Sequence, residues 1–248
     1  MRTMEYITAE ILTNKNIAPE IFSMTLKTPA IQPKPGQFAM LYLSNLLLPR
    51  PISICDFDNE TVTLVYQTVG VGTKIMSELK PTETIKLLAP LGNGFYLPTP
   101  EVPYKNPALV GGGIGTPPLL YLAKTLAASG IKPDIYLGFR SHPILTEEFK
   151  PFANKIHIST DDGSQGHHGK ITDILKNDYD QIMACGPSPL LKALKPFNQG
   201  TKIQLSLEER MGCGIGTCVG CVVKAGENYV RICCEGPVFY SNEVDMYA

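Results

Sequence analysis

The sequence predicts a β protein followed by an α/β protein: an antiparallel barrel, then a parallel-sheet unit, then a small cysteine-rich unit. Three observations predict this order. Short alternating segments broken by turn residues run from 5 to about 86, a glycine-rich turn opens at 111, and four closely spaced cysteines lie between 213 and 233. A chain of 248 residues has room for about two domains of ordinary size and a small third one. We expect the domains to span 1–100, 101–202 and 203–248.

The barrel is predicted from the pattern of its strands. The candidate strands cover 7–12, 21–26, 38–43, 61–66 and 84–88. Strands this short and at this spacing are typical of a small antiparallel barrel. Only 74–79 looks helical, and this segment begins directly after a Gly-Val-Gly-Thr turn.

The α/β unit is predicted to follow a proline-rich linker at 98–103. A short apolar strand at 108–110 leads into a glycine turn and then a helix at 119–128. Further candidate strands cover 135–139, 156–159 and 181–184. Strands that alternate with helices indicate a parallel sheet with crossover helices.

Charge and hydropathy exclude several classes of partner. With 22 Lys+Arg against 23 Asp+Glu, the formal charge is −1, which gives no signal for nucleic acid or an anionic membrane surface. No apolar run approaches the ~20 residues that a membrane span requires. The first six residues lack the charged-then-apolar pattern of a secretion signal, so we expect a soluble, cytoplasmic protein.

Four cysteines form the most specific motif of the chain. Cys213, Cys218, Cys221 and Cys233 have the spacing C-x4-C-x2-C-x11-C, and glycines at 212, 214, 216 and 220 surround the first three. A plant-type ferredoxin loop has the same C-x4-C-x2-C opening. Glycines allow the tight bend that points three sulfurs at one small cluster. The spacing therefore predicts a [2Fe–2S] cluster and an electron-carrying protein.

Two other uses of the cysteines are less consistent with the sequence. Disulfides require an oxidising compartment, for which the sequence gives no signal. Zinc sites usually pair C-x2-C with a second C-x2-C or with histidines, and a C-x4-C arm in a glycine-rich loop fits poorly. The spacing alone leaves the fourth ligand open between Cys233 and Cys234.

Two motifs in the barrel predict a grip on a diphosphate. Arg50-Pro-Ile-Ser-Ile is expected at the end of an apolar strand, where the proline fixes the backbone and the guanidinium can bind a diphosphate bidentately. The Gly-x-Gly-Thr turn at 70–73 opens the only helix of the barrel, and its free N–H groups offer a second grip.

Two turns in the α/β unit predict a nucleotide site. The run 111–115, Gly-Gly-Gly-Ile-Gly, lets a pyrophosphate approach the backbone, although it does not match the Gly-x-Gly-x-x-Gly fingerprint. Cys185-Gly-Pro follows the last candidate strand, so it is expected at the same carboxyl edge of the sheet. The cysteine of this turn is equally consistent with a small buried apolar residue.

In this order, Arg-Pro-x-Ser, Gly-x-Gly-Thr, Gly-Gly-Gly-x-Gly and Cys-Gly-Pro resemble the ferredoxin–NADP reductase superfamily over nearly the whole chain. The tail is more specific. Its run Leu-Glu-Glu-Arg-Met-Gly-Cys-Gly-Ile-Gly-Thr-Cys from 207, with Cys-x-Glu-Gly-Pro-Val-Phe ending at 239, is similar to the electron-transfer subunits of dihydroorotate dehydrogenase B. Glu235 stands where that family usually has aspartate, and the family pattern aligns its fourth cysteine with Cys233.

The resemblance implies a set of cofactor-binding residues. FAD would be held by Arg50, Pro51, Ile52, Ser53, Val65, Tyr66, Gln67, Gly72 and Thr73. NADH would dock from the α/β unit through Gly111, Gly112, Gly113, Gly115, Cys185, Gly186 and Pro187. The loop 160–164, Thr-Asp-Asp-Gly-Ser, resembles a further loop beside the nicotinamide, and it also reads as a plain turn.

The implied activity is an electron relay, from NADH to FAD and on to the [2Fe–2S] cluster, in which the cofactors carry the chemistry. We assign no catalytic acid, base or nucleophile. The implied partner is the FMN-containing dihydroorotate dehydrogenase catalytic subunit of pyrimidine (UMP) biosynthesis, in a heterotetramer of two plus two subunits. The chain is too short to contain the ~250-residue barrel of that subunit as well.

Other functions stay open at this stage. A related NAD(P)H reductase subunit could serve ferredoxin or a hydrogenase instead, and Arg140, after a predicted strand, could bind a 2′-phosphate and favour NADPH. A non-enzymatic redox sensor is a third possibility, although a sensor would require neither a flavin nor a nicotinamide site.

Overall fold

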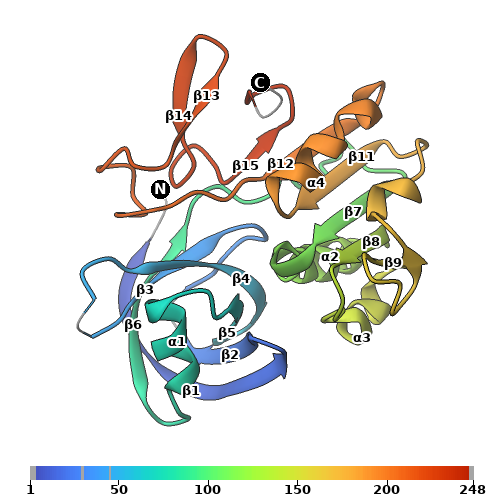
Figure 1. Ribbon diagram of the computed structural model, residues 1–248. Helices are drawn as coiled ribbons and strands as arrows, with labels where there is room; N and C mark the ends of the chain where they lie inside the picture. Colours follow the sequence, from blue (N-terminus) through green and yellow to red (C-terminus); the bar gives the residue numbers. More distant parts are fainter. Residues whose placement is uncertain (1–3, 29–30, 45, 246–248) are drawn as a thin grey trace.

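The computed structural model describes residues 4–28, 31–44 and 46–245, and it confirms the predicted fold class (Figure 1). In Figure 1 a closed antiparallel barrel lies at the lower left, a seven-stranded, mostly parallel sheet lies at the right, and a small two-stranded hairpin lies at the upper left, above the barrel. Residues 1–3, part of the segment considered for a secretion signal, lie outside the described residues.

The barrel consists of six strands and one helix. Its hydrogen-bonded order is β1-β2-β5-β4-β3-β6, and every pair is antiparallel. Alternating side chains point inward because successive residues of a strand face opposite sides. The elements are β1 (Glu5–Ala18), β2 (Ile21–Lys27), β3 (Phe38–Tyr42), β4 (Arg50–Asp58), β5 (Thr61–Gln67), α1 (Val71–Glu78) and β6 (Thr84–Leu91).

One local prediction for the barrel is wrong. Arg50 does not end an apolar strand but begins β4, and the leucines before it lie in the loop from β3. Leu47 in this loop is 96% exposed. Apolar periodicity cannot distinguish a short buried strand from an apolar surface loop, which is why the sequence placed the strand too early.

The sheet has the strand order β10-β9-β8-β7-β11-β12-β15, in which only β15 is antiparallel to its neighbour. The chain reverses its direction of travel across the sheet at β7, so the turns after β7 and β11 meet at one carboxyl edge. The strands are β7 (Pro107–Gly112), β8 (Asp134–Phe139), β9 (Lys155–Thr160), β10 (His167–His168), β11 (Gln181–Cys185), β12 (Lys202–Ser206) and β15 (Val238–Tyr240); the helices are α2 (Pro118–Ala128), α3 (Thr146–Phe149) and α4 (Ser188–Ala193).

The cysteine-rich tail is joined to this sheet on both sides. Strand β12 leads into the cysteine loop, the hairpin of β13 (Val222–Ala225) and β14 (Asn228–Arg231) follows, and β15 returns to pair with β12. The sheet therefore contains strands from both sides of residue 202, and the three-domain division stays a prediction.

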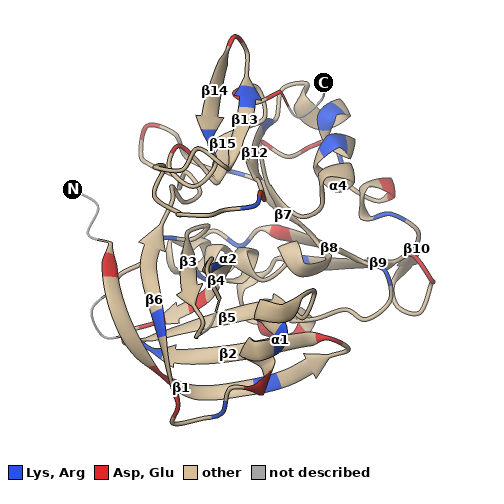
Figure 2. Cartoon of the chain, turned by 60° about the vertical axis from the view of Figure 1, so that its left-hand side comes forward, with Lys and Arg blue, Asp and Glu red and all other residues tan. Residues whose placement is uncertain are grey.

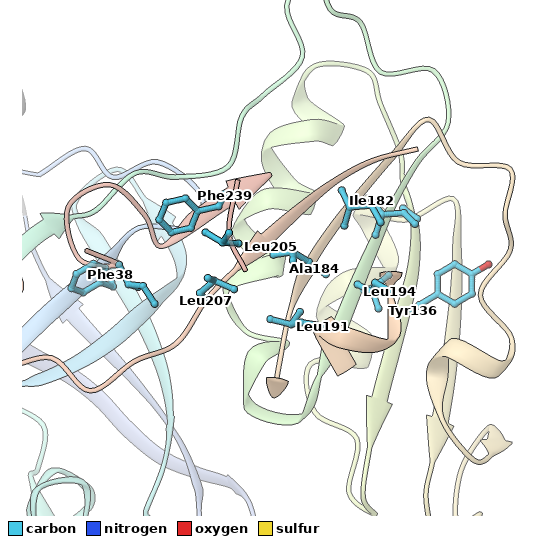
Figure 3. Close-up of a cluster of buried hydrophobic side chains, with 14 of the residues drawn as sticks. Phe38, Tyr136, Ile182, Ala184, Leu191, Leu194, Leu205, Leu207 and Phe239 are labelled. Carbon is cyan, nitrogen blue, oxygen red and sulfur yellow. The ribbon is translucent and has the colours of Figure 1, made fainter. Parts of the chain in front are cut away.

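One buried cluster connects the three parts of the molecule (Figure 3). Phe38 comes from the barrel, Ile182 and Ala184 from the middle of the sheet, and Leu205 and Phe239 from β12 and β15. Cys221, Ile232 and Cys233 belong to the same cluster. Because protein interiors pack densely, this shared core fixes the cysteine loop relative to both the barrel and the sheet.

Helix α2 is also bound to the barrel by polar contacts. Lys124 Nζ donates to Asp56 Oδ1 at 3.1 Å and to the carbonyl of Phe57 at 3.2 Å. The hydroxyl of Tyr121 donates to the carbonyl of Pro33 at 3.0 Å. These contacts hold helix α2, and with it the sheet, against the barrel.

The surface agrees with the near-neutral composition. Figure 2 shows Lys and Arg interspersed with Asp and Glu over the barrel and the sheet, without a continuous basic stripe on the face in view. Within the described part of the chain, no helix is both long enough and apolar enough to cross a membrane.

Candidate cofactor sites

A cavity of about 400 Å³ opens between the barrel and the sheet, and its wall contains most of the residues predicted to hold FAD. The strands β4 and β5 run side by side in the barrel, so two motifs that are separate in the sequence line one wall. The predicted residues on this wall are Arg50, Pro51, Ile52, Ser53, Val65, Tyr66, Gln67 and Thr73.

Gly72, the remaining predicted FAD residue, does not line the cavity but packs against the side chain of Arg50. The Arg50 side chain lies across the first turn of α1, and a Cβ at Gly72 would lie 2.2 Å from its Nε atom. The hydroxyl of Thr73 accepts the N–H groups of Val69 and Gly70 at 2.9 and 3.2 Å, which orders the turn before the helix. A guanidinium and a helix N-terminus thus lie close together at the cavity, an arrangement that fits the predicted diphosphate site.

A second cavity of about 570 Å³ lies over the carboxyl edge of the sheet. Four of the residues predicted for NADH line it: Gly112, Gly113, Gly115 and Pro187. Gln67, Ile114 and Glu208 line both cavities. The two cavities therefore share part of their walls, so molecules bound in them would meet.

Gly111, Cys185 and Gly186 lie behind this second wall. A Cβ at Gly115 would lie 2.5 Å from Cα of Gly186, so the two predicted turns pack backbone against backbone. Burial raises the pKa of the Cys185 thiol, which keeps it protonated and favours the small buried residue over a reactive one.

The loop of residues 160–164 combines a hydrogen-bonded turn with a residue that lines the second cavity. The carboxylate of Asp162 accepts the N–H and the hydroxyl of Ser164 at 3.0 and 2.6 Å, and these hydrogen bonds lower its pKa. Asp162 thus stabilises the turn, while Asp161 lines the second cavity together with Arg140.

Several cavity residues were not predicted. Phe38, Ile114, Pro118, Glu208 and Met211 all reach the first cavity, from three different parts of the chain. Glu208 and Met211 stand inside the Leu-Glu-Glu-Arg-Met run that carried the resemblance, so the sequence contained a signal for these two. Cys213 follows Met211 by two residues, which places the cysteine loop directly after the cavity wall.

The cysteine loop holds the four predicted ligand thiols as two pairs. Cys218 hydrogen-bonds to Cys213, and Cys221 and Cys233 hydrogen-bond to each other. Over residues 4–28, 31–44 and 46–245, no three His, Cys, Asp or Glu side chains already converge as one metal-binding group. The two sulfurs within each pair are close together. To bind one cluster, both pairs would have to surround the same centre.

Backbone N–H groups point at these sulfurs. Ile215 and Cys218 donate to Cys213 Sγ at 3.5 and 3.4 Å, and Gly216 donates to Cys233 Sγ at 3.1 Å. Although burial alone would raise the pKa of the Cys213 thiol, the hydrogen bonds from Cys218 and Ile215 lower it to about 6, whereas burial and the neighbouring Cys221 thiol raise the pKa of Cys233. Thiolate ligands and N–H donors aimed at sulfur fit an anionic iron–sulfur cluster.

Cys233 and Cys234 have different surroundings. Cys233 is buried and its sulfur accepts the N–H of Gly216 inside the loop. Cys234 is half-buried, and its sulfur would lie 2.6 Å from a Cβ at Gly216. The sulfur of Cys233 also hydrogen-bonds to Cys221, whereas the sulfur of Cys234 lies beside the same loop at Gly216, so the choice of Cys233 as the fourth ligand stays a prediction.

A barrel and a parallel sheet that enclose two adjoining cavities, with a thiol loop beside the first, define an oxidoreductase of the ferredoxin–NADP reductase class with an added iron–sulfur domain. The family model for the iron-sulfur cluster binding domain of dihydroorotate dehydrogenase B matches residues 208–245. The chain is 39% identical over 246 residues to the dihydroorotate dehydrogenase B (NAD(+)) electron transfer subunit of Caldanaerobacter subterraneus subsp. tengcongensis, covering 95% of this chain and 97% of the relative. It is 37% identical to the same subunit of Clostridium perfringens, covering 98% and 99%. The chain belongs to the family of electron transfer subunits of dihydroorotate dehydrogenase B.

Solved structures support the same fold. An NADH-dependent reduced ferredoxin-NADP oxidoreductase, studied for flavin-based electron bifurcation, matches with a TM-score of 0.86 and 30% identity, covering 96% of this chain and 90% of that one. A ferredoxin NADP+ reductase from Neisseria gonorrhoeae matches with a TM-score of 0.65 and 18% identity, covering 77% and 89%, and it shows the fold alone.

The contact between Arg50 and Gly72 can be tested by replacing the glycine. We expect Gly72→Ala to displace the guanidinium and to weaken FAD binding by about 10- to 100-fold, the equivalent of about 1.5–3 kcal/mol for a charge-assisted hydrogen bond. Flavin content after purification and titration of the flavin-free protein with FAD measure the effect.

Ser77→Ala is the control, because Ser77 lies in the same helix and its exposed hydroxyl bonds only to the carbonyl of Lys74 among the hydrogen bonds that the structure shows for it. Equal flavin affinity in the two variants would contradict the placement of Arg50.

Proposed function

We propose that this chain passes electrons between NAD(H) and the FMN-containing catalytic subunit of dihydroorotate dehydrogenase, through FAD and a [2Fe–2S] cluster. One observation carries the proposal: the two cavities share Gln67, Ile114 and Glu208, and Met211 at the wall of the first leads directly into the cysteine loop. FAD can accept two electrons as a hydride and release them singly, which links a nicotinamide to a one-electron cluster.

We propose that the first cavity holds FAD. Arg50 and the N-terminus of α1 would bind the diphosphate, and Thr73 keeps the turn before α1 ordered. Pro51, Ile52, Ser53 and the β5 residues Val65, Tyr66 and Gln67 would contact the remainder of the molecule. Since Val65 and Tyr66 are buried, the part of the wall that they form would keep water away from the bound flavin.

We propose that the second cavity holds NAD(H). The turn 111–115 packs against the turn 185–187 through glycines, which leaves room for a pyrophosphate at the carboxyl edge of the sheet. Gly112, Gly113, Gly115 and Pro187 would contact the dinucleotide, while Gly111, Cys185 and Gly186 maintain the backbone behind them.

We further propose Cys213, Cys218, Cys221 and Cys233 as the cluster ligands, and domains at 1–100, 101–202 and 203–248. The buried sulfur of Cys233 and its hydrogen bond from Gly216 support this ligand set over one with Cys234.

Electrons would leave at the surface around Cys218. This cysteine is exposed, residues 211–222 contain no charged side chain, and Ile215 and Val219 of the same loop are exposed apolar residues. The leucine loop before β4 lies beside it, since Cδ2 of Leu48 is 4.0 Å from the Cβ position of Gly212. Both loops lie on the left-hand side of Figure 1. We propose this apolar surface as the docking site of the catalytic subunit, within an assembly of two plus two subunits.

A reductase subunit that serves ferredoxin is the second candidate function. It is favoured by the 30% identity to the NADH-dependent reduced ferredoxin-NADP oxidoreductase and by Arg140 in the second cavity, where a guanidinium could contact a 2′-phosphate.

The decisive test is purification of the tagged chain from its own cells. We expect the purified chain alone to contain flavin and two iron atoms and to be reduced by NADH, and the complex to reduce NAD+ when dihydroorotate is added. Recovery of a ferredoxin or hydrogenase subunit in place of a dihydroorotate-oxidising flavoprotein would reject the proposed partner. Absence of flavin from the gently purified chain would reject the relay itself.

The choice of the fourth ligand predicts a difference between neighbouring cysteines. Cys233→Ala should abolish the cluster, because a tetrahedral iron loses one of its thiolates, whereas Cys234→Ala should retain it. Iron content and the visible absorbance of the cluster measure the outcome. The opposite result would show that Cys234 is the ligand.

The docking surface predicts an effect on assembly. Leu47 is 96% exposed, and Leu47→Asp should remove its apolar contacts with the catalytic subunit. We expect the affinity for that subunit to fall at least about tenfold, which equals about 1.4 kcal/mol of binding free energy. Ile17→Asp is the control, since Ile17 is an exposed apolar residue near the far end of β1. Size-exclusion chromatography of the mixed subunits measures the affinity, and unchanged NADH-dependent flavin reduction confirms that the variants are folded. Equal affinity of both variants would place the interface elsewhere.

A further inference from the structure

We propose that Arg231, held in place by Glu235, is a positioning residue that orders the cysteine loop through Gly216 and thereby sets the reduction potential of the cluster. The inference rests on the proposed [2Fe–2S] site and adds to it a residue that is not a ligand. Arg231 ends β14 and lies two residues before Cys233 in the sequence. Its side chain contacts the cysteine loop at Gly216.

The turn that carries Cys233 closes on Arg231. The carbonyl of Arg231 accepts the N–H groups of Cys234 and Glu235 at 3.0 and 2.9 Å. The carboxylate of Glu235 folds back, where its Oε2 accepts the backbone N–H of Arg231 at 2.7 Å and its Nε–H at 3.1 Å. Its Oε1 accepts a further hydrogen bond from Nη2. The guanidinium is therefore held bidentately in one orientation.

The third guanidinium nitrogen, Nη1, reaches the cysteine loop. Arg231 Nη1 donates to the carbonyl of Gly216 at 2.9 Å, and the N–H of the same glycine donates to Cys233 Sγ at 3.1 Å. A continuous path of hydrogen bonds thus leads from Glu235 through Arg231 and Gly216 to the sulfur of Cys233.

Gly216 is the residue that this path requires. Its φ of +83° is one that side-chain-bearing residues rarely adopt. A Cβ at this position would lie 2.6 Å from Cys234 Sγ and 3.1 Å from Arg231 Nη1. The loop can approach the guanidinium only because residue 216 has no side chain.

These contacts act on the cluster in one direction. An added electron makes the cluster more negative, so an N–H donor to a ligand sulfur and a nearby positive charge both favour the reduced form. Ordering Gly216 keeps its N–H directed at Cys233 Sγ, and loss of that order lowers the reduction potential even where the charge of residue 231 is retained.

An ordinary surface ion pair would behave differently. The side chains of Arg231 and Glu235 are 39% and 37% exposed, and partly exposed ion pairs usually contribute little to stability. If only charge mattered, a lysine at 231 would be equivalent to arginine, and neutralising Glu235 would raise the potential because a negative charge is removed. If Arg231 acts by positioning the loop, Arg231→Lys is not equivalent to arginine, and Glu235→Gln lowers the reduction potential of the cluster.

The test uses Arg231→Lys and Glu235→Gln in the full chain, with Lys224→Gln as control. Lys224 forms a surface ion pair with Asp245, so the control alters one nearby charge without touching the loop. Redox titration followed by electron paramagnetic resonance gives the potential and the spectrum of the reduced cluster, and a chelator challenge gives the rate of iron loss.

We expect both test variants to favour the oxidised cluster by about tenfold relative to the unaltered chain, a fall of about 59 mV for one electron, and to lose iron faster. Their spectra should be broadened, while the control matches the unaltered chain. Iron loss during purification of Arg231→Lys, with FAD retained, also supports positioning, since the charge is conserved.

A potential, spectrum and iron-loss rate unchanged in Arg231→Lys, together with a raised potential in Glu235→Gln, would overturn the inference. A failure of the proposed function would be seen in a different measurement. If the unaltered chain bound no iron, the cluster site itself would be rejected before any variant was compared.

Discussion

The packing of the barrel against the tail of the chain is the constraint on which the sites depend. Phe38 and Met40 of β3 share one buried cluster with Leu205, Phe239 and the cysteine turn. A Cβ at Gly214 would lie 2.6 Å from Met40, so the cysteine loop rests directly on the barrel. Asn93 adds polar contacts, with its N–H donating to the carbonyl of Gly236 at 2.6 Å and its side-chain amide to that of Glu235 at 2.7 Å. The loop, the first cavity and the second cavity therefore lie in a fixed order, which an electron relay requires.

At three glycines, the absence of a side chain allows close contacts between elements at the candidate sites. At Gly72 the backbone of α1 allows Arg50 to lie across the helix start, and at Gly115 one turn of the sheet touches the next. At Gly216 the loop reaches Arg231. In each case a methyl group would push apart two elements that are distant in the sequence. Glycine serves here less for flexibility than for close approach between backbones and charged groups.

Close fit also explains how a neutral protein can handle anionic cofactors. The net charge is −1, and Figure 2 shows no broad basic surface in its view. In the proposed sites, anions would instead be accommodated by local groups: a guanidinium and a helix N-terminus at the first cavity, glycine turns at the second, and N–H donors in the cysteine loop. Such groups act at short range, where little water screens them, so a large net charge is not needed.

The order of barrel, sheet and cysteine tail was determined by the sequence, because strand alternation, glycine turns and cysteine spacing are local patterns. The same patterns predicted cofactor contacts for Arg50, Thr73, the turn at 111–115 and the four cysteines, and these assignments stay predictions. Tertiary structure decided what depends on contacts between distant segments: that β12 and β15 insert the tail into the sheet, and that Glu208 and Ile114 line both cavities. It also decided that Arg50 begins its strand, and that Arg231 meets Gly216. Local pattern reports how a segment folds, whereas the packing of the whole chain selects its neighbours.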